Sequence, residues 1–165
     1  MADEVYGGYA SKFGIGKESV FKTAVNATKL LEIESETMDE TRNWLDAEGV
    51  DGTRSRAKHR SAQTTQDPRG GFVLNGVKGA DLDLLLELAL GNYASGTAYL
   101  GDTLPSFTVV KYAPPRYDVF SGCKMASLEF SASDDAQELK VSAEAIAALF
   151  AEGDAGDFGA ADYAD

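Results

Sequence analysis

The most strongly patterned part of the chain is residues 104–132, which read LPSFTVVKYAPPRYDVFSGCKMASLEFSA. Residues 107–112 are mostly β-branched or aromatic and are followed by Pro114-Pro115, so we predict a strand that ends before the prolines. Residues 124–132 alternate, which predicts a second strand with one buried face and one face toward solvent or a partner. Its apolar positions are Ala126, Leu128, Phe130 and Ala132, and its polar positions are Ser127, Glu129 and Ser131.

Further strands are predicted on both sides of this stretch. Apolar and acidic residues alternate over residues 28–36, a second extended segment follows at 37–45, and glycines bracket the short apolar run 72–74. Residues 139–149 alternate like a strand but also contain strong helix formers, so a helix there is the alternative to the strand that we favour.

A single helix is predicted over residues 81–90. Asp81 is a suitable N-cap, the leucines follow helical spacing, and Gly91 stands where a left-handed residue commonly ends a helix. These patterns together predict a mainly β (α+β) fold with one flanking helix.

The two ends of the chain show no such pattern. Residues 1–27 have no sustained period and are predicted to be an irregular N-terminal arm, which leads into a β domain over residues 28–150. Residues 151–165 are rich in Asp, Gly and Ala, and this composition cannot order itself alone. We therefore predict an acidic flexible tail that is either disordered or docked on another surface.

The chain has 165 residues, with 15 Lys and Arg against 27 Asp and Glu, which gives a formal net charge of −12. This length suits one compact domain, and the acidic surplus argues against a free-standing DNA- or RNA-binding protein. No apolar run approaches the ~18 residues needed to cross a bilayer, so we predict no membrane segment. Cys123 is the only cysteine, which excludes an intramolecular disulfide.

Two sets of like charges fall at every second position, where an extended strand places them on one face. The basic set could be a solvated edge strand or a nucleic-acid patch, but it lacks interleaved aromatic residues for base stacking. We favour pairing of the basic set with an acidic face of another subunit. The basic set is Arg54, Arg56, Lys58 and Arg60, and the acidic set is Glu32, Glu34 and Glu36.

Signals for catalysis or cofactor binding are weak. His59 is the only histidine, so a catalytic triad or a histidine metal cluster would have to be built around it. Residues 14–19 look superficially like a phosphate loop, but Glu18 follows Lys17 where Ser or Thr is required. We predict no enzyme activity, no cofactor and no metal.

Six segments, taken in order, resemble the major tail tube proteins of tailed bacteriophages. Each motif is short, but their order is preserved over about residues 13–150. The segments are GIGKESVFKTAV (14–25), LEIESE (31–36), GTRSR (52–56), LALG (88–91), LPSFTV (104–109) and FSGCKM (120–125).

This resemblance implies a β-sandwich or partial barrel that assembles into hexameric rings with an inner β-barrel. The rings would stack into a virion tail tube that conducts DNA into the host, with DNA only as passing cargo. The expected partners are other copies of the chain and further tail proteins, namely the tape measure, the tail terminator and the tip or baseplate. Assembly would take place in the host bacterial cytoplasm.

The resemblance also suggests roles for individual residues. The basic set, together with Phe13 and Phe21 of the aromatic arm, would make contacts between subunits or rings. The acidic set would face the lumen, where carboxylates repel DNA phosphates and prevent sticking.

Two other classes of function stay open at this point. The first is an oligomeric β-rich carbohydrate- or protein-binding module that uses the tyrosine-bearing segments around Tyr93, Tyr99 and Tyr112. The second is a hydrolase that uses the paired carboxylates of Glu32 and Glu34.

Overall fold

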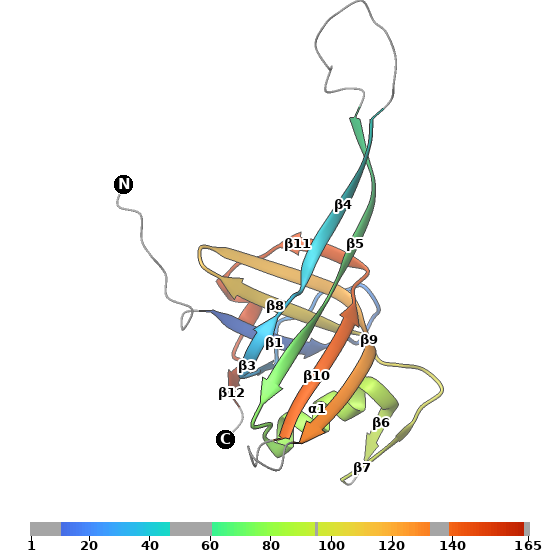
Figure 1. The fold of residues 1–165 in the computed structure, drawn as a ribbon, viewed down its shortest axis with the longest axis vertical. Coiled ribbons are helices and arrows are strands. Elements are labelled where there is room, and N and C mark those ends of the chain that lie inside the picture. Colours follow the sequence, from blue (N-terminus) through green and yellow to red (C-terminus); the bar gives the residue numbers. More distant parts are fainter. Residues whose placement is uncertain (1–10, 47–60, 95, 133–138, 164–165) are drawn as a thin grey trace, which may run out of the picture.

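The computed structural model describes residues 11–46, 61–94, 96–132 and 139–163. Strands dominate these residues, and α1 (Gly79–Leu90) is their one α-helix, so the predicted mainly β fold with a flanking helix is confirmed. A long β-hairpin projects from one end of the molecule, and α1 lies near the opposite end (Figure 1).

All described strands except the two of residues 91–100 form one sheet, which folds over on itself along its longest strand, β9 (Arg116–Ala132). The first half of β9 belongs to what we call the β8 layer and the second half to the β10 layer. The β8 layer also contains β1 (Lys12–Lys17), β2 (Lys29–Leu30), β8 (Phe107–Ala113), β11 (Leu149–Glu152) and β12 (Asp162–Tyr163). The β10 layer also contains β3 (Ile33–Glu36), β4 (Asp39–Asp46), β5 (Ser61–Asn75) and β10 (Leu139–Ile146).

The change of partner along β9 is visible in its register. Phe107 of β8 pairs with Cys123, whereas Ile146 of β10 pairs with Lys124. Gly122, at this junction, has φ 65°, a conformation that glycine adopts without a steric penalty. β9 therefore connects the two layers as a continuous strand.

Large apolar side chains from both layers meet in the main core, and α1 covers one end of it. Leu85 and Leu88 of the helix are completely buried in this cluster. The other main members are Phe13, Ile15, Leu31, Met38, Phe72, Leu74, Phe107, Val109, Phe120 and Val141. Complete burial of a side chain of this size stabilises a fold by about 1.5–3 kcal/mol.

The helix begins two residues before the predicted start, and its N-cap is Lys78. Asp81 therefore lies in the first turn, where it is buried and pairs with Lys29 Nζ at 2.9 Å. The predicted C-terminal signal is confirmed, since Gly91 has φ 99° and donates its N–H to the carbonyl of Glu87.

The prediction of an irregular arm is wrong for residues 12–17, which form β1 between β2 and β8. Phe13 and Ile15 are buried, but Gly14 and Gly16 occupy the intervening positions and hide the period of two. A Cβ atom on Gly14 would lie 2.7 Å from that of Ala27, so a larger residue would not fit there.

The tail docks on the β8 layer over its described residues. Asp154 caps the short 3-10 helix η3 (Ala155–Phe158), and β12 pairs in parallel with β2. Phe158 is buried in a second, smaller core with Ala27, Leu30, Val110 and Val119. Of the two states that we left open for the tail, docking is the one observed for residues 152–163.

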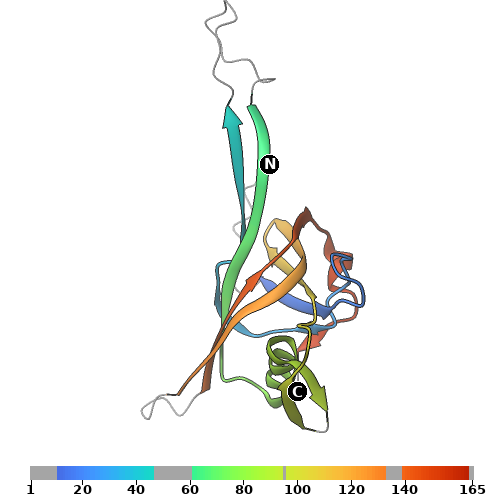
Figure 2. The same ribbon diagram turned by 90° about the vertical axis from the view of Figure 1, so that its right-hand side faces the viewer.

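The predicted strand over residues 28–36 is interrupted, because Leu31 and Glu32 separate β2 from β3. The strand predictions at 37–45, 72–74, 107–112 and 139–149 are confirmed by β4, β5, β8 and β10, although β5 is much longer than predicted. β4 and β5 form an antiparallel hairpin that projects from the body in both views (Figures 1 and 2). Residues 91–101 contain a second hairpin, formed by β6 (Gly91–Ala94) and β7 (Thr97–Leu100).

Candidate functional site

Residues 124–132 of β9 form an open edge of the β10 layer. They pair with β10 on one side, and no described strand pairs with the other side. β4, in turn, pairs only with β5 among the described strands. The β10 layer therefore ends in two different open edges, and open edges can pair with another chain.

An apolar groove lies along the open edge of β9, between this strand and α1. It has a volume of about 400 Å³. Phe130 in its wall is 47% exposed, and Ala126 is also exposed. The groove is lined by Leu86, Ala89, Leu90, Met125, Ala126, Ser127, Leu128 and Phe130.

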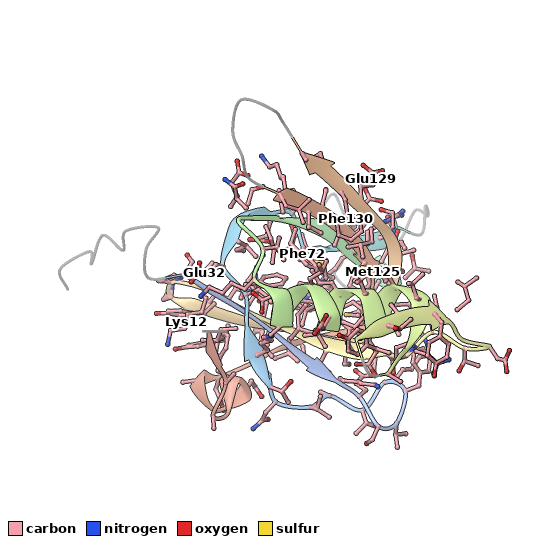
Figure 3. The ribbon with its side chains drawn as sticks, turned by 90° about the horizontal axis from the view of Figure 1, so that it is seen from below. Lys12, Glu32, Phe72, Met125, Glu129 and Phe130 are labelled. Atoms are coloured by element: carbon pink, nitrogen blue, oxygen red, sulfur yellow. The ribbon has the colours of Figure 1, made fainter. Side chains whose placement is uncertain are left out.

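The prediction of a buried apolar face on this strand is thus only partly right. Met125 is buried and Leu128 half-buried, but Ala126, Phe130 and Ala132 remain exposed. The register shift at Glu144/Ala145 of β10 also places Met125, rather than Ala126, opposite a buried residue. Phe130 lies on the α1 side of the strand, and Glu129 on the other (Figure 3).

The face of β9 and β10 that points away from the core is polar. Glu129 lies opposite Ser142, and Ser127 lies opposite Glu144. Both glutamates are exposed. Glu144 was not among our candidates, although the alternation of residues 139–145 contains the signal that would have placed it on this face.

Glu32, Glu34 and Glu36 do not share one strand face, which corrects the prediction. Glu32 precedes β3, and a register shift between Ile33 and Ser35 breaks the alternation. Glu36 then lies opposite the core residue Phe72.

Each of these three carboxylates pairs with a lysine from a different element. Glu34 Oε2 lies 2.6 Å from Lys140 Nζ of β10. Glu36 Oε1 lies 3.2 Å from Lys111 Nζ of β8, and Glu32 Oε1 lies 3.4 Å from Lys78 Nζ at the start of α1. Glu32 and Glu34 keep 64% and 45% of their side chains exposed, whereas Glu36 keeps 24%.

Phe13 is 1% exposed and packs against Phe72, with 4.9 Å between the ring centroids. This burial removes Phe13 from the surface of the folded chain, so the predicted contact role of its ring is wrong. Phe21, in the loop between β1 and β2, is 51% exposed and stays a candidate.

The loop that carries Phe21 is fixed by a buried carboxylate that sequence reasoning missed. Glu18 is 6% exposed, and its Oε1 accepts hydrogen bonds from Thr108 Oγ1 at 2.8 Å and Gly122 N at 2.7 Å. Its Oε2 accepts a third from Lys22 N at 3.2 Å. Nothing in the local sequence distinguishes Glu18 from a surface glutamate.

Arg54, Arg56, Lys58, Arg60 and His59 lie outside the described residues. Their predicted roles therefore stay predictions.

The three tyrosines of the alternative binding module do not form one surface. Tyr93 and Tyr99 occupy adjacent rows of the β6–β7 hairpin, opposite Ala98 and Asn92, so they point to opposite faces. A hydrogen bond to Asp83 raises the pKa of the half-buried Tyr93. Tyr112 instead stacks on Tyr117 in the β8 layer, with 4.3 Å between centroids.

Reactive chemistry is not assembled within the described ranges. No group of three or more His, Cys, Asp and Glu side chains there could hold a metal ion, and none of the helices found there is long and apolar enough to span a membrane. Burial raises the pKa of the Cys123 thiol to about 12, so the thiol stays protonated at neutral pH. Residues 14–17, which look like part of a phosphate loop, lie in β1.

Comparison with known proteins gives a family match. The family model described as phage tail tube protein matches residues 8–165. No curated protein sequence matches the chain.

Solved structures show the same fold at low sequence identity. A chain in the structure of the PVC sheath/tube terminator, from an extracellular contractile injection system in the extended state, matches with a TM-score of 0.57 and 9% identity, over 93% of this chain and 100% of its own. A chain in the 6-fold symmetrised baseplate of the anti-feeding prophage matches with a TM-score of 0.55 and 10% identity, over 93% of this chain and 97% of its own. A chain in the virion of a native gene transfer agent particle matches with a TM-score of 0.51 and 12% identity, over 91% of this chain and 100% of its own.

Proposed function

The chain belongs to the phage tail tube protein family, and on that premise we propose that it is the non-enzymatic subunit of stacked hexameric rings that form a tube for DNA. It is thus a structural tail protein, and the match over residues 8–165 is the observation that carries the proposal. The similarity to a chain in a 6-fold symmetrised baseplate supports sixfold rings.

The two open edges of the β10 layer supply a way to close such a ring. Residues 124–132 of β9 in one copy would lie beside β4 of the next copy, and each contact would join two different edges. Head-to-tail contacts of this kind close into a ring when a whole number of equal rotations completes a full turn without a shift along the axis. The joined β10 layers would then form the inner barrel.

Phe130 and the apolar groove would be covered by the neighbouring copy. An exposed apolar strip beside an open strand edge favours association over a monomeric state. The predicted partners beyond the ring are further tail proteins, which would meet the ends of the tube.

The polar face of the β10 layer would line the lumen. It presents Glu129, Glu144 and Lys140 among serines, and Glu34 reaches the same face through its ion pair with Lys140, so three carboxylates stand against one lysine among these residues. A lumen with surplus negative charge repels phosphates and lets DNA slide. We therefore retain Glu34 in this role, with Glu32 beside it, and add Glu129 and Glu144.

Contacts between stacked rings are proposed for Arg54, Arg56, Lys58 and Arg60. These residues follow β4 and precede β5, the hairpin that projects farthest from the body (Figure 1). They would meet acidic surfaces of the adjacent ring. The tube would be assembled in the host bacterial cytoplasm and become part of the virion tail.

A matched pair of variants tests the ring contact. Phe130→Glu places a charge in the apolar groove, whereas Leu100→Glu places the same charge on the β7 residue that is 82% exposed. Sedimentation and electron microscopy should show rings or tubes for wild type and Leu100→Glu but not for Phe130→Glu. Equal assembly of all three proteins would contradict the proposed edge.

The lumen assignment has its own test. Glu129→Lys and Glu152→Lys make the same change in net charge, but Glu152 lies on β11 in the other layer. Tubes of the first variant should hold DNA in a nuclease-protected form, and tubes of the second should not. Protection by the Glu152→Lys tubes alone would contradict the assignment.

A further inference from the structure

The β4–β5 hairpin leaves the body of the molecule at one narrow junction. β5 pairs with β10 only from Arg69 onward, so its outer part, residues 61–68, has β4 as its only partner among the described strands. The hairpin therefore stands away from the body as a two-stranded ribbon (Figures 1 and 2). Such a ribbon twists more than a wide sheet, so the contacts at its base decide its direction.

The two residues between β3 and β4, Thr37 and Met38, lie directly against β5 at this junction. A Cβ atom on Gly70 of β5 would lie 2.3 Å from the carbonyl oxygen of Thr37 and 2.6 Å from Cα of Met38, so a larger residue would not fit there without a shift of the backbone. Thr37 N donates to the Gly71 carbonyl at 2.8 Å, and Thr37 Oγ1 accepts a hydrogen bond from Gly71 N at 3.0 Å. Close packing and hydrogen bonds thus both fix the crossing.

Lys111 of β8 holds the same crossing from the other layer. Its Nζ donates a hydrogen bond to the Met38 carbonyl at 2.7 Å and lies 3.2 Å from Glu36 Oε1. Glu36 Oε2 in turn accepts a hydrogen bond from Met38 N at 2.9 Å. Met38 is completely buried and the Lys111 side chain is 14% exposed, so water competes little for these bonds. Lys111 therefore ties the base of the hairpin to the β8 layer.

We propose that Lys111 is a positioning residue for ring closure, because it sets the direction of β4 relative to the open edge of β9 in the same chain. This inference rests on the proposed ring, in which β4 of one copy lies beside β9 of the next. The angle between these two edges within one chain then sets the rotation from copy to copy. Since a ring closes only when equal rotations complete a full turn, the junction determines how many copies it holds.

The neighbouring ion pair between Glu34 and Lys140 cannot do the same. It also involves β3, but its partner strand is β10, so it joins two strands of one layer. Its side chains are 45% and 44% exposed, and an ion pair that is open to water contributes little. Lys140 is therefore a matched control for Lys111.

The test counts the copies in each ring. Lys111→Met removes the ammonium group but keeps the apolar stem, and Lys140→Met makes the same change at the lysine that pairs with Glu34. Rings of each full-length protein are classified by electron microscopy. We expect six copies throughout for wild type and Lys140→Met, and rings of more than one size or unclosed arcs for Lys111→Met.

A second readout follows the junction itself. Hydrogen exchange at the amides of Thr37 and Met38 should be about tenfold faster in Lys111→Met, because the crossing loses a charge-assisted hydrogen bond. The same amides should exchange at the wild-type rate in Lys140→Met. A general loss of stability would instead accelerate exchange in β8 and β9 as well.

A milder variant decides the question if Lys111→Met does not fold. Thr37→Val removes the exposed hydroxyl that binds Gly71 N, and Thr97→Val makes the same change at an exposed residue of β7. Mixed ring sizes for Thr37→Val but not for Thr97→Val would then support the inference. Uniform rings of six from folded Lys111→Met protein, or from Thr37→Val where the first variant does not fold, would overturn the inference and leave the ring intact. Wild-type protein that forms no rings would overturn the proposed function and the inference with it.

Discussion

Thr108 Oγ1 donates a hydrogen bond to Glu18 Oε1 across 2.8 Å, and both residues are buried. Thr108 also accepts a hydrogen bond from Val25 N at 3.1 Å, so the pair fixes both ends of the loop between β1 and β2. A single buried carboxylate thereby connects the first strand of the chain to the β8–β9 hairpin.

Glu18→Ala should lower the free energy of unfolding by about 3 kcal/mol, because Thr108 and Gly122 lose a buried acceptor. Glu18→Gln keeps an acceptor oxygen and should cost only about 1 kcal/mol. Urea denaturation of the two variants measures the difference. Equal and small losses in both would show that the hydrogen bonds to Glu18 contribute little.

Phe158→Ala should lower the free energy of unfolding by about 3 kcal/mol, since the ring fills the smaller core beside Leu30 and Val110. Tyr99→Ala removes an exposed aromatic ring and should change the free energy of unfolding by less than about 0.5 kcal/mol. Thermal and urea unfolding provide the comparison. If Phe158→Ala unfolds like wild type, the docking of the tail does not stabilise the chain.

The thiol of Cys123 gives a pH dependence with a defined sign. Burial raises the pKa of this thiol from 9.0 to about 12, so in this range of pH the folded state holds a proton that the unfolded state releases. Its contribution to stability is complete below pH 9.0 and is lost as the pH rises toward about 12.

Urea denaturation of wild type and Cys123→Ser at a series of pH values isolates this effect. The stability of wild type relative to the variant should fall as the pH rises through that interval, and a thiol reagent should react with the folded protein slowly at neutral pH. If the difference in free energy of unfolding between wild type and Cys123→Ser stays constant with pH, the burial of the thiol is contradicted.

Much of the fold could be predicted from the sequence where side chains report their own environment. The β-branched and aromatic residues of β8, the alternation of β10 and the helical spacing of the leucines in α1 each indicate the element that forms. β1 was missed because glycine at positions 14 and 16 replaces the polar residues that would mark a strand. The N-cap was placed three residues too late, at Asp81 rather than Lys78, because an acidic residue suits the N-cap and the first turn equally well.

The candidate site was less predictable, because its properties depend on contacts between distant segments. The lysines that pair with Glu32, Glu34 and Glu36 come from α1, β10 and β8, and no local pattern shows these partners. The exposure of Phe130 likewise depends on where α1 ends against β9. Alternation alone assigns Phe130 to a buried face.

The contact between rings can be tested by charge reversal. Arg54→Glu combined with Arg56→Glu should prevent or weaken the stacking of rings, while the thermal unfolding of the unassembled chain changes little. Lys12→Glu, a reversal at an exposed residue of β1, is the control and should assemble normally. Tubes of normal length from the double variant would show that these arginines are not at the contact.

The central claim is that this chain builds a tube, and electron microscopy of the assembled full-length protein tests it most directly. The account predicts rings with sixfold symmetry that stack into tubes, with the polar face of β9 and β10 toward an open lumen. Protein that remains monomeric at high concentration, or assemblies without a central channel, would contradict it.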